Sequence, residues 1–164
     1  MLLVVREPLQ RSRVPIDSSN YEERTMALQT YSGACHCGAV QFKADIDLSK
    51  GTTRCNCSIC AKQRAWFTIV KADKFRLLRG ESALSDYQWT PPGRSEANLH
   101  YRFCNSCGVR AFAQGDHETL GGKFYAVAVS TLENADPDEL AESIKYVDGR
   151  HDHYDRPPAD TRLL

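Results

Sequence analysis

The sequence has no net charge, no long apolar run and no repeated or low-complexity segment. Twenty-one Lys and Arg residues balance 21 Asp and Glu residues, so the basic excess or basic stripe typical of nucleic-acid binding is missing. The same balance gives no polybasic membrane anchor. No stretch approaches the roughly 20 apolar residues that a membrane-spanning helix needs. We therefore expect neither a nucleic acid nor a membrane among the partners of this chain.

A secretory signal is also missing from the start of the sequence. The apolar opening, residues 1–5, is short and is followed at once by Arg6 and Glu7. A signal peptide needs an apolar core of about 7–15 residues. We therefore expect a cytoplasmic protein whose thiols stay reduced. In that setting the seven cysteines indicate metal binding or redox chemistry rather than disulfides.

Short alternating segments separated by turns predict a mainly β domain. Val40, Phe42, Ala44 and Ile46 alternate with polar residues, which is the period of a half-buried strand. Further strands are predicted at residues 65–71, 84–89, 98–103 and 124–130. The last of these is the most apolar and is expected to be central, and a single short helix is expected at residues 138–143. The pattern predicts two or three small antiparallel sheets packed around metal-binding loops.

The two ends of the chain lack this periodicity. Residues 1–30 hold scattered Pro, Asp and Ser, and we expect them to form a flexible N-terminal extension. Residues 31–155 hold all the cysteine motifs and form the expected zinc-binding domain. The polar stretch from Asp148 onward is expected to be extended, with residues 156–164 as a C-terminal tail.

The seven cysteines form three groups with the spacing of metal ligands. They are the C-x-C pair Cys35 and Cys37, the C-x-C-x-x-C triplet Cys55, Cys57 and Cys60, and the C-x-x-C pair Cys104 and Cys107. Zn²⁺ binds thiolates at about 2.3 Å in tetrahedral geometry, and sulfurs two or three residues apart reach one ion from a tight turn. A glycine follows the second cysteine of each pair, where it permits the positive φ of such a turn.

Counting ligands divides the cysteines between two ions. Each pair supplies half of a tetrahedral site, so the two pairs combine to hold one structural Zn²⁺. This ion would tie together chain segments about 70 residues apart and so contribute to folding. The triplet Cys55, Cys57 and Cys60 is predicted to hold a second Zn²⁺ whose fourth position is open, as in catalytic zinc sites.

Other interpretations of the triplet stay open at this point. A histidine such as His36, His100 or His117 would complete a second structural site. Cys57 and Cys60 would form a redox dithiol, although the βαβ context of such motifs is missing. An iron–sulfur cluster is compatible with thiolate ligands, but a division into four and three suits zinc better.

The motifs, taken together, resemble those of the glutathione-dependent formaldehyde-activating enzyme family, which also includes centromere protein V. They are GACHCGAV from Gly33, CNCSIC from Cys55 and FCNSCG from Phe103, and the resemblance covers about residues 30–155. It extends to Asp148-Gly149-Arg150-His151 near the end. The centromere-associated branch carries basic extensions that this sequence lacks, so its microtubule or chromatin role is not expected here.

The resemblance implies a β-tent fold around a structural zinc, with the cysteines divided as above. It also implies a carbon–sulfur lyase that forms or breaks a thiol–aldehyde adduct such as S-hydroxymethylglutathione, with glutathione as co-substrate. Two rival functions remain, a glutathione-binding carrier with little catalysis and a purely structural zinc domain that serves protein contacts.

The zinc site of the triplet Cys55, Cys57 and Cys60 is the predicted catalytic site. The co-substrate thiol would occupy the open position and lose its proton there. Candidate cations near it are Lys62, Arg64 and Arg54. Candidate proton donors, by residue type alone, are His36, His100, His151 and His153. Trp66 and Phe67 follow the triplet and are expected either to wall the site or to pack in the core.

Overall fold

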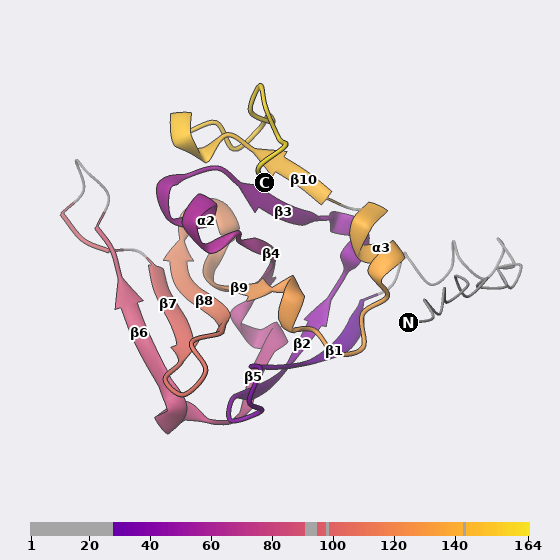
Figure 1. Cartoon of the computed structure of the whole chain (residues 1–164), viewed down its shortest axis with the longest axis vertical. Coiled ribbons are helices and arrows are strands. Elements are labelled where there is room, and N and C mark those ends of the chain that lie inside the picture. The colour runs from indigo at the N-terminus through magenta and orange to yellow at the C-terminus, as the bar shows by residue number, and fades with distance from the viewer. Residues whose placement is uncertain (1–27, 91–94, 98, 143) are drawn as a thin grey trace, which may run out of the picture.

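Two β-sheets dominate the computed structural model, which describes residues 28–90, 95–97, 99–142 and 144–164 (Figure 1). The smaller sheet has the strand order β1-β2-β5, and the larger has the order β10-β3-β4-β9-β8-β7-β6. The mainly β fold predicted from the sequence is therefore confirmed. Among the described residues, no helix combines the length and apolar character needed to cross a bilayer.

The smaller sheet is antiparallel and contains β1 (Gln29–Ala34), β2 (Gln41–Ile46) and β5 (Phe75–Arg79). The alternation predicted for the second strand is confirmed, because Val40, Phe42, Ala44 and Ile46 are at most 1% exposed. The polar residues between them face the opposite side. This sheet therefore buries one face only, as a period of two requires.

The larger sheet is antiparallel except at one edge. Its strands are β3 (Thr52–Cys55), β4 (Trp66–Lys71), β6 (Leu84–Gln88), β7 (Leu99–Cys104), β8 (Arg110–His117), β9 (Gly122–Ala128) and β10 (Ile144–Val147). Strand β10 pairs in parallel with β3, so a late segment of the chain lies beside an early one. The apolar strand β9 lies at the centre of the sheet, as predicted.

The core lies between the two sheets and is built around aromatic rings. The Phe75 ring centroid lies 5.2 Å from that of Phe42, 4.7 Å from that of Phe112 and 4.0 Å from that of Tyr125. Each fully buried side chain of this size contributes about 1.5–3 kcal/mol. Because Phe112 and its neighbours fill this side of the larger sheet, its other side is left free to form a site.

Two α-helices interrupt the strands in the described part of the chain. The predicted helix is confirmed as α3 (Pro137–Glu142). The expectation that it would be the only helix is wrong, because α2 (Ser58–Gln63) lies between β3 and β4. Both helices have six residues, too few to show a helical period, but α3 begins with Pro137, a helix-start signal that α2 lacks. Arg64, in the left-handed conformation with φ of 50°, ends α2.

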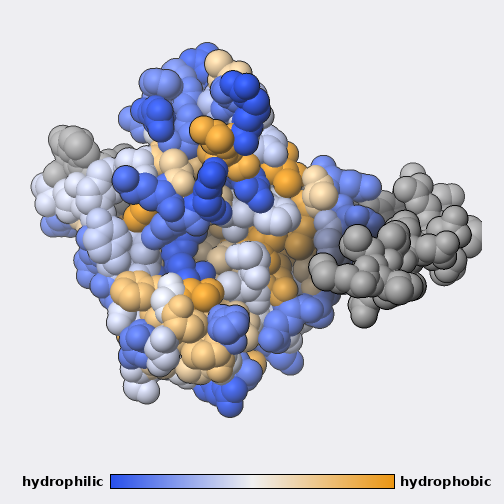
Figure 2. Space-filling view, viewed as in Figure 1, coloured by the Kyte–Doolittle hydropathy of each residue, from blue (hydrophilic) through white to orange (hydrophobic). Residues whose placement is uncertain are grey.

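The predictions of a flexible N-terminal extension and an extended C-terminal stretch can be compared with the structure only in part. Most of the predicted flexible extension, residues 1–27, lies outside the described residues, and β1 begins at Gln29. The expectation of an extended chain from Asp148 is wrong at its start, where Gly149–His151 form a 3₁₀ turn. In Figure 1 the C-terminal segment lies over β10 and β3, and Figure 2 shows it as a largely hydrophilic lobe.

Candidate functional site

The first cysteine set contains the four residues that the sequence paired. Cys35, Cys37, Cys104 and Cys107 come together with all four sulfurs within 4.8 Å of one another. The Sγ atom of Cys37 lies 3.6 Å from those of Cys35 and Cys104. Tetrahedral coordination with metal–sulfur bonds of about 2.3 Å requires sulfurs about 3.8 Å apart. The donor set and its spacing therefore fit a zinc ion.

Backbone turns shape this first set. Gly38 and Gly108 adopt φ of 72° and 73°, as the sequence predicted for the residue after each pair. The backbone N–H of Val40 donates to the Cys35 sulfur at 3.3 Å. Backbone N–H groups, that of Val109 first, lower the pKa of Cys107 to about 6. The turn that holds Cys104 and Cys107 therefore stabilises negative charge on these two sulfurs.

The second set contains the triplet, brought together by a strand end and a short helix. Cys55 ends β3, Cys57 caps α2 and Cys60 lies within it, and the three sulfurs lie within 4.8 Å of one another. Hydrogen bonds from the Cys55 and Cys60 thiols lower the pKa of Cys57 to about 2. Hydrogen bonds with Cys55 and Cys57 raise the pKa of Cys60. Without a cation the set favours a single thiolate, so a divalent ion is what allows all three sulfurs to be anionic.

No fourth protein ligand joins the triplet within the part of the chain that is described. No His, Asp or Glu atom lies with the three sulfurs at the spacing of a metal site. Two of the histidines considered as ligands have other partners. His100 Nδ1 pairs with Asp86 Oδ2 at 2.7 Å, and His117 Nδ1 accepts from the Thr119 backbone N–H at 3.3 Å. The geometry therefore favours a three-sulfur set with one open position.

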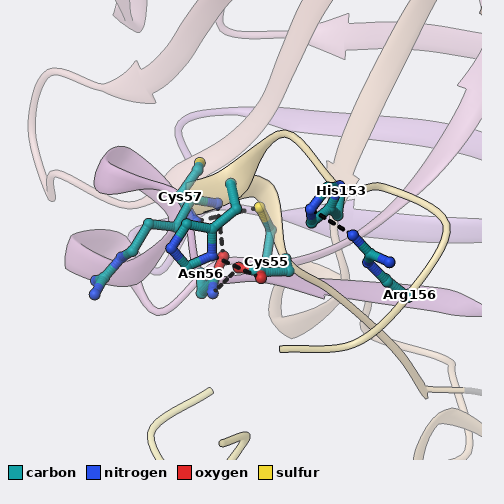
Figure 3. Close-up of polar contacts among 8 residues, drawn as sticks. Cys55, Asn56, Cys57, His153 and Arg156 are labelled. Atoms are coloured by element: carbon teal, nitrogen blue, oxygen red, sulfur yellow. Dashed lines mark hydrogen bonds and ion pairs between the residues drawn. The ribbon is translucent and has the colours of Figure 1, made fainter. Parts of the chain in front are cut away.

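Polar contacts attach the C-terminal segment to this second set (Figure 3). The Asn56 amide donates to Asp148 Oδ1 at 2.6 Å, and its oxygen accepts from the Arg150 backbone N–H at 2.8 Å. The other oxygen of Asp148 pairs with His151 Nδ1 at 2.7 Å. The Asn56 amide, followed by His151, lowers the pKa of Asp148. Asn56, which lies between two of the cysteines, thus fixes the triplet loop to a segment about 90 residues later in the chain.

Gly149 brings this segment into direct contact with the triplet. A Cβ atom at Gly149 would lie 2.6 Å from Cys55 Sγ and 3.3 Å from Cys57 Cβ. Carbon and sulfur do not approach so closely without strain. Only a residue without a side chain fits here, so the Asp148-Gly149-Arg150-His151 motif is part of the wall around the second set.

A cavity of about 430 Å³ opens beside the triplet on the side of the larger sheet that faces away from the core. Its lining is Thr53, Cys55, Cys60, Phe67, Ile69, Leu99, Tyr101, Arg110, Ala113, His117, Thr119, Leu120, Phe124, Ala126, Val147 and Tyr154. Two of the triplet cysteines thus form part of its wall. A molecule in the cavity would lie next to the open side of the sulfur set.

Arg110 is the cation of this lining, and the sequence did not single it out. Its guanidinium lies 5.8 Å from the centroid of the Tyr101 ring and donates to Gln63 Oε1. Burial lowers the pKa of Arg110, and its proximity to Cys60, Tyr101 and Cys57 opposes that shift. Burial raises the pKa of Tyr101, and its proximity to Cys60 and Cys57 raises it further. The triplet therefore has a half-buried positive charge and a protonated hydroxyl for neighbours.

The three cations expected from the sequence do not line the cavity. Arg54 stacks on the Trp66 ring at 4.8 Å from its centroid, and Arg64 donates to the Leu163 carbonyl. Neither they nor Lys62 line the cavity. Sequence reasoning selected neighbours along the chain, whereas the sheet brings Arg110 to the triplet from a distant strand.

The remaining candidates divide between the cavity and the rest of the fold. Phe67 lines the cavity, whereas the Trp66 indole donates to Thr52 Oγ1 at 2.8 Å and its ring packs against the core. None of the four histidines proposed as proton donors lines the cavity. His117, which was not proposed for that role, does line it. In Figure 3 His153 lies beside Arg156, and its Nε2 is 2.5 Å from that guanidinium. Tyr101, Tyr154 and Arg110 are among the lining residues that sequence reasoning missed.

The fold and the two cysteine sets define a mainly β domain that is able to hold metal ions and has a cavity beside one of its sites. The family model described as "glutathione-dependent formaldehyde-activating enzyme" matches residues 30–147. The chain belongs to that family. It is also similar to a Rhodobacter sphaeroides protein of known crystal structure, with 28% sequence identity and a TM-score of 0.56. The match covers 69% of this chain and 97% of the other.

Proposed function

We propose that the protein is a zinc-dependent carbon–sulfur lyase that forms or breaks a thiol–aldehyde adduct such as S-hydroxymethylglutathione. The observation that carries this proposal is the triplet of Cys55, Cys57 and Cys60, which has three sulfurs, no fourth protein ligand among the described residues and a cavity at its side. Family membership supports the same class of chemistry.

Two zinc ions are proposed per chain. Cys35, Cys37, Cys104 and Cys107 would hold the structural ion, and Cys55, Cys57 and Cys60 would hold the other. When bound at the triplet, zinc supplies a Lewis acid that takes the co-substrate thiol, glutathione in the simplest case, as a thiolate. All seven cysteines are free thiols, which fits the reducing cytoplasm proposed for this protein.

The reaction itself needs no oxidant or reductant. A carbon–sulfur bond forms between thiol and aldehyde, the π bond of the carbonyl breaks, and the thiol proton ends on the former carbonyl oxygen. Activating the thiol gains at most about 30-fold, or about 2 kcal/mol, because a thiol of pKa about 8.5 is a few per cent ionised at neutral pH. The larger contribution must therefore come from holding the two reactants together.

The chain supplies charge and a proton-bearing group around the triplet. Three cysteine thiolates and an incoming sulfur leave an excess of negative charge, which the half-buried Arg110 guanidinium offsets. The carbonyl oxygen gains negative charge as the bond forms, and Arg110 and the protonated Tyr101 hydroxyl are donors in the same lining. Closely placed donors of this kind contribute about 10²–10³ in rate in other enzymes.

The test is the rate of adduct exchange between formaldehyde and glutathione, followed by NMR with zinc-loaded protein and with a no-protein blank. We expect acceleration by the wild-type protein and a loss of 10-fold or more in kcat/KM for Arg110→Ala. Arg54→Ala is the matched control, since Arg54 also stacks on an aromatic ring but lies outside the cavity. A wild-type rate equal to the blank refutes the lyase and leaves a carrier.

A further inference from the structure

The cavity is far larger than the smallest aldehyde requires. Its volume of about 430 Å³ lies in the range of sites that enclose drug-sized ligands, roughly 300–1,000 Å³. Formaldehyde has only two heavy atoms, little more than a water molecule, which occupies about 30 Å³. A site for formaldehyde alone would leave most of this space unfilled.

The walls of the cavity are mainly apolar. Side chains from β4, β7 and β9 converge on it, among them Phe67, Ile69, Leu99, Phe124 and Ala126. Two of the apolar lining side chains also reach solvent, since Ile69 is 38% exposed and Leu120 is 41% exposed. An apolar group would enter past these side chains and exchange water for hydrocarbon contact on several sides.

The charges of the cavity do not match glutathione. Glutathione carries two carboxylates and one ammonium group, so a site that enclosed it would need matching cations and an anion. The described lining contains no Lys, Asp or Glu, and its cation Arg110 already contacts Gln63 and Tyr101. The charged ends of glutathione therefore remain outside, and the interior suits an uncharged group.

We propose that the natural adduct carries an aromatic or branched alkyl group that fills this cavity, attached to the aldehyde or to the thiol. This inference rests on the proposed lyase function and names its substrate class. The bond changes are those of the parent reaction: the carbon–sulfur bond forms, the carbonyl π bond breaks and the thiol proton moves to oxygen. The apolar group takes no part in the bond changes and acts through binding.

The experiment compares three reactant pairs on the zinc-loaded protein, each against its own blank. They are formaldehyde with glutathione, phenylacetaldehyde with glutathione, and formaldehyde with 2-phenylethanethiol. We expect kcat/KM for at least one phenyl-bearing pair to exceed that of the first pair by about 30-fold, which corresponds to about 2 kcal/mol for one buried phenyl group. The last two pairs show which reactant supplies the apolar group.

Two variants test whether the cavity causes this preference. Ala126→Phe on β9 fills the space from a lining position and should lower the preference at least 10-fold. Ala141→Phe adds the same atoms at an exposed position on α3, outside the lining, and should leave the preference unchanged. Zinc content and circular dichroism report whether each variant folds. Independently of folding variants, 2-phenylethanol should inhibit the wild-type reaction at concentrations about 30-fold below methanol.

Each outcome has one meaning. A preference for a phenyl-bearing pair that Ala126→Phe reduces supports the inference, as does selective inhibition by 2-phenylethanol. Acceleration of the formaldehyde–glutathione pair that equals or exceeds both phenyl-bearing pairs overturns the inference and leaves the lyase intact. No acceleration of any pair refutes the lyase, and the inference fails with it.

Discussion

Replacing Gly149 by alanine should damage the second cysteine set and spare the first. The added Cβ would lie 2.6 Å from Cys55 Sγ, 3.3 Å from Cys57 Cβ and 3.3 Å from Tyr154 Cε1. To reach ordinary van der Waals separation the sulfur must move by at least about 0.9 Å. Metal–ligand distances tolerate only about 0.2 Å, so Cys55 would no longer fit the proposed zinc site.

The expected magnitude follows from that displacement. Changes to groups that merely support metal ligands cost about 10–100-fold in affinity, so a displaced ligand should cost about 100-fold or more. Zinc titration against a chelator should show two tight sites per wild-type chain and one in Gly149→Ala. Arg150→Ala is the matched control on the same turn, because only the backbone N–H of Arg150 is used there. Two sites of wild-type affinity in Gly149→Ala would refute the assigned contact.

Three further predictions concern the two sets and their support. Cys104→Ser should remove the closed site and lower the melting temperature by about 10 °C, which corresponds to a loss of about 3 kcal/mol; an unchanged melting temperature would show that this site does not stabilise the fold. Asn56→Ala should cost about 1–3 kcal/mol in the attachment of the C-terminal segment, because two polar partners lose their hydrogen bonds; faster amide hydrogen exchange at residues 148–156 than in Ser85→Ala checks this. The pKa of Asp148 is lowered in the folded state. Its contribution to stability is therefore present above the ordinary carboxyl pKa and is lost as pH falls through the folded value. Hydrogen exchange of the C-terminal segment should rise with acid in the wild type and depend less on pH in Asp148→Asn.

The cysteine sets follow from the sequence because ligand number and spacing obey local chemical rules. Two pairs are expected to close one site and the triplet to form another, and the structure brings the sulfurs of each grouping within 4.8 Å of one another. Strand β2 could also be predicted from the sequence, because Phe42, Ala44 and Ile46 face the core while the polar residues between them face outward. A single burial period leaves a readable signal in the sequence.

Strand β8 shows why the cavity and its Arg110 could not be predicted from the sequence. Ala111, Phe112 and Ala113 are all buried, since β8 lies between the core and the cavity, and alternation disappears when both faces are covered. Arg110 opens this strand, and nothing along the chain links it to Cys60, 50 residues earlier. The cavity is assembled by non-local strand pairing, which local periodicity does not encode.

The parallel pairing of β10 with β3 has a consequence for how the protein is made. The ribosome adds the three cysteines of the triplet about 90 residues before it adds the turn at Gly149 that covers them. Contacts between such distant segments form late in folding. The thiol triplet of a nascent chain therefore stays accessible to solvent until β10 pairs with β3. During that interval the three thiols can bind metal prematurely or become oxidised.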